Sequence, residues 1–152
     1  MIDSELAAFL EEGMPAHLAT RNERLEPDGT RVVAAAVETD GRHLVAYIPA
    51  AASARLLPDL EASGQVAVVF SRPPDERSCQ VKGRFAGARP ARADEQAFVQ
   101  AQWDRCLERL ASIGFARATF GHWSAWPCTA VRVQVDAIFN QTPGPGAGAP
   151  LA

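Results

Sequence analysis

The clearest structural signal in the chain is VVAAAVETDGRHLVAYI, residues 32–48. Two short apolar runs, 32–38 and 43–48, are separated by TDGR, whose Asp40-Gly41 pair is typical of a tight β-hairpin turn. Both runs are apolar at successive positions, so we expect these strands to be covered on both faces. A small barrel has only one inside, which predicts a second subunit, related by a two-fold axis, over the other face.

Further strands are predicted on both sides of this hairpin. They are AHLATR (16–21), QVAVVFS (65–71), SCQVKGRFAGARPA (78–91) and TAVRVQVDAIF (129–139), while RNERLEPDG (21–29) is expected to be a polar turn. Val81 and Gly83 alternate with Gln80 and Lys82, which predicts one buried and one polar face for that strand.

Three helices are expected around these strands. The first begins near Ile2, the second covers 50–63, where Pro58 fits only near a helix start, and the third runs from about 93 to 113. The apolar stripe of the third helix contains Trp103, Leu107 and Leu110. Strands joined mostly by hairpins predict a mainly β, α+β protein: an antiparallel barrel with flanking helices.

Composition limits the function classes. The 152 residues fit one domain; 47% are hydrophobic and 22% charged, and the net charge of −3 weighs against a nucleic-acid partner. No apolar run approaches the roughly 18 residues that cross a bilayer, and the acidic start predicts a cytoplasmic protein without a signal peptide. The cysteine and histidine spacings show no metal motif, so we expect no metal site and three packed thiols.

The segment IPAAASARLL (48–57) is the first candidate for chemistry. Ser53 and Arg55 stand at the predicted entrance to a helix, where free N–H groups and a positive partial charge suit a phosphate. The alternative is that Ser53 is an ordinary helix cap and Arg55 a solvated charge.

Two other positions are weaker candidates. Arg31 leads into the apolar run at 32–38, where an exposed arginine is common. Gln80 and Lys82 share a polar strand face, which either is simply solvated or lines a cleft for a planar, electron-accepting ring. The chain contains no Walker loop motif. The only match to a Rossmann glycine motif, GPGAGA at 144–149, is empty because no helix follows it.

Together and in this order, these segments resemble the pyridoxamine 5′-phosphate oxidase-like, FMN-binding split-barrel family. The resemblance covers nearly the whole chain and implies an antiparallel split barrel, a homodimer and FMN bound in clefts at the subunit interface. It assigns Ser53 and Arg55 to the Ser-x-Lys/Arg that holds the FMN phosphate, and Arg31 to the basic residue before the second strand. Gln80 falls near the glutamine that faces the flavin, with Lys82 two residues further on.

The C-terminus departs from the family pattern. The true oxidases end in an Arg-Leu-Ala-Pro type segment that holds the substrate phosphate, whereas this chain ends FNQTPGPGAGAPLA without an arginine. We therefore expect a single FMN-binding domain, 1–140, and a Pro/Gly-rich tail, 141–152. The Pro-Gly pairs either turn the tail back against the domain or its partner, or precede a disordered end.

The function implied is a flavin-dependent oxidoreductase, with no catalytic residue assigned, that acts on an unknown small molecule with a reduced nicotinamide as electron donor. Alternatives are a non-catalytic dimer that holds or senses a flavin or haem, and a structural dimer without a ligand. Trp123 and Trp126 either stack on a ring or fill a core edge.

Overall fold

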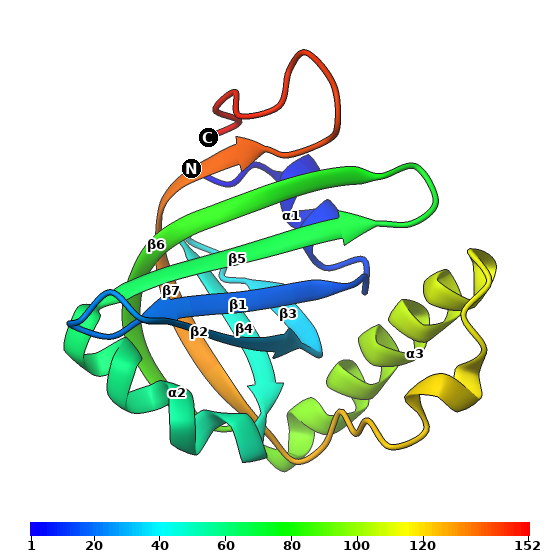
Figure 1. Cartoon of the computed structure of the whole chain (residues 1–152), viewed down its shortest axis with the longest axis horizontal. Coiled ribbons are helices and arrows are strands. Elements are labelled where there is room, and N and C mark those ends of the chain that lie inside the picture. Colours follow the sequence, from blue (N-terminus) through cyan, green and yellow to red (C-terminus); the bar gives the residue numbers. More distant parts are fainter.

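The chain folds into one curled antiparallel sheet with helices around it, in a computed structural model that describes all of residues 1–152 (Figure 1). The strands are β1 (Ala16–Arg21), β2 (Pro27–Val32), β3 (Ala34–Val37), β4 (His43–Pro49), β5 (Gln65–Arg72), β6 (Arg77–Pro90) and β7 (Cys128–Asn140). The helices are α1 (Ser4–Leu10), α2 (Ala50–Ser63) and α3 (Gln96–Ser112), with short 3-10 turns η1 (Ala93–Glu95) and η2 (Arg117–Phe120).

The strand order, β2-β1-β5-β6-β7-β4-β3, explains how the sheet curls. β2 and β3 lie at opposite edges of the sheet but follow each other directly in the chain. The Val33 N–H between them donates to the Tyr47 carbonyl of β4 at 2.8 Å. The chain therefore passes from one edge to the other and bends the sheet into a split barrel, so the predicted fold class is confirmed.

The main core fills the inside of the curl. Alternate side chains of each strand point inward, among them Leu18, Val68, Val81 and Val133, all fully buried. Two helices close this space: α1 contributes Leu6, Phe9 and Leu10, and α2 contributes Leu56 and Leu60. At the β3–β4 hairpin, Gly41 has φ +62°, the left-handed conformation that the Asp-Gly turn predicts.

A second core lies outside the barrel, between α3 and strands β3 and β4 (Figure 1). Trp103 is 4% exposed, and it belongs to the same cluster as Val99, Ala34 and Tyr47. The predicted packing of the third helix is confirmed, with Leu107 and Leu110 partly buried against the cluster. The inference that another subunit must cover the second apolar face of residues 32–48 is wrong, however. Helix α3 of the same chain covers that face, so these strands do not require a second subunit.

α3 also protects the free edge of the sheet. The Gln102 side chain, 1% exposed, accepts from the Ala35 N–H at 2.9 Å and donates to the Ala35 carbonyl at 2.7 Å. The Glu11 carboxylate accepts from the Val37 N–H at 2.6 Å. Two side chains thus form hydrogen bonds with backbone groups of β3 that would otherwise be free to pair with another chain.

Two local predictions are wrong. The segment 21–29 is not all turn, because Pro27 begins β2, a seventh strand that pairs with β1 up to Val32. Pro58 lies in the interior of α2 rather than near its start. The helix spans the expected residues because packing of Leu56 and Leu60 against the core outweighs the one backbone hydrogen bond that a proline cannot form.

The Pro/Gly-rich tail folds back on the end of β7. Asn140 N–H donates to the Ala149 carbonyl at 2.8 Å, Leu151 N–H donates to the Ile138 carbonyl at 2.7 Å, and Phe139 pairs with Pro150 in an isolated bridge. Of the two readings of the Pro-Gly pairs, the turn back against the domain is the observed one. No helix of the structure has the length and apolar character needed to cross a membrane.

Candidate functional site

The outer face of β2, β1, β5, β6 and β7 carries a row of side chains in direct cross-strand register. Across these five strands, neighbour by neighbour, the row consists of Arg31, His17, Val69, Gln80 and Phe139. Two of the predicted site residues, Arg31 and Gln80, therefore share one face. Three strand spacings of about 4.8 Å separate their strands, roughly 14 Å in all, so they suit opposite ends of an elongated ligand.

The next row on this face is made of small residues with a lysine among them. It consists of Gly29, Ala19, Ala67, Lys82 and Ala137, again opposite one another across the strands. Four of the five project a methyl group or nothing, so a planar ring over Gly29, Ala19 and Ala67 meets no bulky side chain. Lys82 is exposed and its Nζ lies 5.1 Å from the centre of the Phe139 ring.

Two open hollows lie along these rows. One, of about 490 Å³, is lined by residues that include Ala19, Ala67, Lys82 and Phe139. The other, of about 700 Å³, includes Val69 and Gln80 and extends under the Pro73-Pro74 turn. Gln80 and Lys82 thus border neighbouring hollows rather than a single closed pocket.

Arg55 lies at the β2 end of the small-residue row. Its Nη2 donates to the Gly29 carbonyl at 3.3 Å, and its Nη1 forms an ion pair with Asp28. The Arg55 side chain is 56% exposed, so its guanidinium is accessible while paired. The structure places the predicted phosphate-binding arginine against the β2 backbone at the Gly29 end of the row that contains Lys82, with its partner Asp28 on the opposite face of β2.

Ser53 is not the cap of α2. The helix begins at Ala50 after Pro49, and no side chain caps its first turn. The Ser53 hydroxyl lies within that first turn and donates to the Ala50 carbonyl at 2.7 Å. Of the two readings for Ser53, the ordinary N-cap is therefore wrong.

Arg31 points away from Arg55. Its guanidinium carbon lies 4.9 Å from the centre of the Trp123 ring, and its Nη2 donates to the Ser124 carbonyl at 3.5 Å. Its Nε is buried and has no hydrogen-bond partner. Burial lowers the pKa of Arg31. The structure therefore brings Arg31 to the aromatic segment before β7 and not into contact with Ser53 or Arg55.

The tryptophans near Arg31 form a core edge. The Trp123 ring centre lies 6.2 Å from that of Trp103 and 5.0 Å from that of Phe120, and Trp126 packs against the same cluster. The structure thus supports the packing reading of the Trp123–Trp126 pair. The three cysteines are buried as expected, and burial raises the pKa of Cys79 to about 12 and those of Cys106 and Cys128 to about 11, so none is a reactive thiolate.

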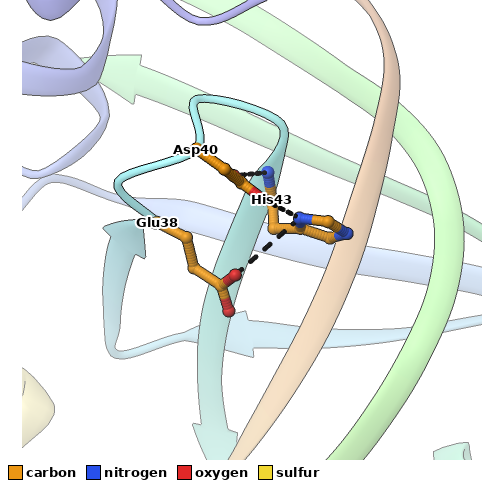
Figure 2. A group of neighbouring side chains, drawn as sticks. All are labelled: Glu38, Asp40 and His43. Carbon is orange, nitrogen blue, oxygen red and sulfur yellow. Dashed lines mark hydrogen bonds and ion pairs between the residues drawn. The ribbon is translucent and has the colours of Figure 1, made fainter.

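Sequence reasoning missed a charged cluster at the β3–β4 hairpin, Glu38, Asp40 and His43 (Figure 2). The His43 Nδ1 lies 2.6 Å from an Asp40 carboxylate oxygen and 3.7 Å from a Glu38 one. Arg132 donates to both oxygens of Glu38, each at 2.8 Å, and these bonds lower the pKa of Glu38. Because the members already pair with one another and with Arg132, the cluster is an ion-pair network of the hairpin. The E-T-D-G-R-H spacing was the only sequence signal for it.

The missed residues are His17 and Phe139 on the outer face, and Asp28, which lies on the opposite face of β2, across from Thr20. His17 alternates with the buried Ala16 and Leu18, so strand periodicity alone could have assigned it to this face. Asp28 lay in the segment interpreted as a turn, and its pairing with Arg55 depends on tertiary structure.

No protein-family model matches the chain, and no curated protein sequence matches it. Solved structures do. HupZ of Group A Streptococcus is similar with a TM-score of 0.58 at 16% identity, over 98% of this chain and 99% of that one. A structure from Lactobacillus delbrueckii, described as a candidate pyridoxamine 5′-phosphate oxidase, gives 0.53 at 14% identity, over 91% and 93%. An FMN-binding protein from Syntrophomonas wolfei gives 0.51 at 11% identity, over 90% and 81%.

This chain has the pyridoxamine 5′-phosphate oxidase-like split-barrel fold. The resemblance drawn from the sequence is confirmed at the level of the fold. Similarity at identities this low establishes the fold. The ligand and the reaction are inferred from the residues of this chain.

Proposed function

We propose that this split barrel is an FMN-binding flavoprotein that transfers electrons between a reduced nicotinamide and a small organic acceptor. The observation that carries the proposal is the small-residue row, which joins Arg55 at the Gly29 end to Lys82 on β6 with no bulky side chain between them. Such a row suits a planar ring with an anionic tail. Support also comes from the fold, which this chain shares with an FMN-binding protein and a candidate oxidase.

In this proposal the phosphate lies at α2. The first turn of α2 has no side-chain cap, the Ser53 hydroxyl lies in that turn, and Arg55 is accessible. A helix start with a hydroxyl and a guanidinium suits a dianionic phosphate. The phosphate would take the place of Asp28 on Arg55, whose side chain is 56% exposed in this ion pair, while that of Asp28 is 23% exposed.

The ring would lie over Ala19 and Ala67, with Gln80 and Lys82 at its far end. The Gln80 amide can both donate and accept hydrogen bonds at a ring edge, and the Lys82 ammonium favours a ring that carries negative charge. When bound, a flavin supplies the hydride and single-electron chemistry. The residues of this chain bind and orient it, and we assign none of them as a general acid or base.

We further propose that two copies associate as a homodimer through this open face. Val69, Ala67 and Phe139 are only partly buried, and no helix of the chain covers them as α3 covers β3 and β4. A second copy related by a two-fold axis would remove this apolar surface from water and enclose the ring. Sedimentation of a monomer at micromolar concentration would contradict the dimer.

The absorbance spectrum of the purified protein is the first test. Flavin bands support the proposal. A Soret band would indicate a haem-binding split barrel, and a colourless protein that ignores added FMN would indicate a structural role.

The phosphate contact has a sharper test, titration of flavin fluorescence with FMN and with riboflavin, which lacks the phosphate. Hydrogen bonds to charged groups contribute about 1.5–3 kcal/mol, so Arg55→Ala should weaken FMN binding about ten- to a hundredfold and leave riboflavin binding unchanged. Asp28→Asn, which removes the competing carboxylate, should tighten FMN binding by up to about fivefold.

Arg117→Ala is the matched control, because Arg117 is 57% exposed and also paired with a carboxylate. It should leave both affinities unchanged. Equal affinities of the native protein for FMN and riboflavin would show that no phosphate site exists here.

A further inference from the structure

A cavity of about 160 Å³ lies between β1, β2, α3 and the segment that leads to β7, beside the open face. Its walls are mostly aromatic and aliphatic, with Trp103, Leu110, Phe115, Phe120 and Trp123 among them. The rings pack on one another, with centre separations of 6.0 Å for Phe115–Phe120 and 5.0 Å for Phe120–Trp123. None of its lining residues is acidic.

Arg31 lines the same cavity and is electrostatically unbalanced. Burial alone lowers the pKa of its guanidinium, and no carboxylate lies near enough to compensate its charge. Its only hydrogen bond is the 3.5 Å contact from Nη2 to the Ser124 carbonyl, and its buried Nε has no acceptor at all. A buried donor without an acceptor costs stability, so an acceptor brought to this guanidinium gains more than an ordinary surface contact does.

The cavity is partly open, since Phe115 at its wall is 48% exposed, and its volume indicates the size of the ligand. An apolar cavity of about 150 Å³ in another protein binds benzene, so this volume accommodates a single ring. Aromatic walls favour edge-to-face contacts with such a ring, and an arginine at the wall favours a carboxylate, which takes two parallel N–H bonds from a guanidinium.

We propose that this aromatic cavity binds a small carboxylate with one aromatic ring, of the size of benzoate. The ring packs among Trp103, Phe120 and Trp123, and the carboxylate meets Arg31, whose Nε gains its missing acceptor after a rotation of the side chain. His17, which lies opposite Arg31 on β1, also lines this cavity. This site goes beyond the proposed flavin function and does not depend on it.

The test is isothermal titration of flavin-free protein with benzoate, benzamide and acetate. Benzoate should saturate one site per chain. Benzamide, with the same ring but no charge, should bind at least about tenfold more weakly, and acetate, which has no ring, should not bind. Arg31→Met should weaken benzoate about ten- to a hundredfold, the range expected for hydrogen bonds to a charged group.

Arg21→Met is the matched control, because Arg21 is also a half-buried arginine of the open sheet whose hydrogen bond goes to a backbone carbonyl. It should leave benzoate binding unchanged. Leu110→Trp, which fills the cavity and leaves Arg31 in place, should abolish binding, with circular dichroism to verify folding; Phe120→Leu is the milder variant and should weaken it.

Three results would each overturn the site: no saturation at millimolar benzoate, equal affinity for benzamide, or equal effects of the Arg31 and Arg21 variants. Because no flavin is present, the outcome is independent of FMN binding. A protein that binds benzoate but not FMN keeps this site and loses the proposed function, and the reverse result does the opposite.

Discussion

The two halves of the sheet differ in what covers their outer faces. On β3 and β4, α3 buries Trp103 and Val99 against the strands and holds the free edge through Gln102. On the outer face of β1, β5 and β6, the stretch that carries Ala19, Ala67 and Lys82 is covered by no helix of the chain, whereas His17 of β1 lines the cavity beside α3. The covered half is therefore expected to supply stability, and the open half to supply binding.

The largest effect should come from the covered half. Trp103→Ala removes a 4% exposed aromatic side chain from the outer core and should lower the free energy of unfolding by about 3–5 kcal/mol. Urea denaturation measures this loss. Val69→Ala on the open face should cost about 1 kcal/mol or less, and equal losses in the two variants would remove the distinction between the halves.

The edge contact of α3 should come next. Gln102→Leu leaves the Ala35 N–H and carbonyl without partners inside the protein, and each unsatisfied group costs about 1–3 kcal/mol. We expect a loss of roughly 2–4 kcal/mol in urea denaturation. Gln100→Leu, an exposed glutamine on the same helix, is the control and should change little.

The start of α3 should make stability depend on pH. Arg89 donates to both oxygens of Glu95, at 2.7 and 2.6 Å. These bonds, with one from the Arg92 N–H and one from the Tyr47 hydroxyl, lower the pKa of Glu95 to about 2. Because the folded pKa lies below the unfolded value, this stabilisation is complete above about pH 4.5 and is lost as the pH falls toward 2.

Glu95→Gln should therefore cost about 1.5–3 kcal/mol at pH 7, and the difference from the native protein should shrink as the pH falls to 3. Urea midpoints measured across that range test it, with the exposed Glu108→Gln on α3 as control. A difference that stays constant with pH would contradict the ion pair's role.

The smallest change in stability should come from the open face. Ala67→Glu places a charge on the small-residue row and should shift the free energy of unfolding by about 0.5 kcal/mol or less, while weakening FMN binding more than tenfold and disfavouring the dimer. Ala36→Glu, at a half-buried alanine packed against the α3 cluster, should instead cost about 1–3 kcal/mol. Urea denaturation measures the change in stability of both variants, fluorescence titration measures their FMN affinity, and sedimentation measures dimer formation.

Local patterns predicted most of the fold. The Asp40-Gly41 turn, the alternation around Val81 and the stripe through Trp103 each depend on neighbouring residues, and all three are confirmed. β2 was missed because its sequence, PDGTRV, begins with turn-forming residues and has only one apolar side chain that is buried, Val32. The second cover of residues 32–48 was attributed to a partner because periodicity shows that a face is apolar without showing what lies on it.

The candidate site was predicted less completely. Strand alternation correctly assigned Gln80 and Lys82 to one face, but the row from Gly29 to Ala137 depends on the register between strands far apart in sequence. The partners of Arg31 and Arg55, which are Trp123 and Asp28, are tertiary contacts and leave no spacing signal in the chain.

The most direct test of the central claim is a crystal structure of the protein soaked with FMN. We predict electron density for the ring over Ala19 and Ala67 with Gln80 within hydrogen-bonding distance, and for the phosphate at Ser53 and Arg55 in place of Asp28. Density for the flavin at any other surface, or none at saturating FMN, would contradict the claim that the open half of the sheet is the binding face.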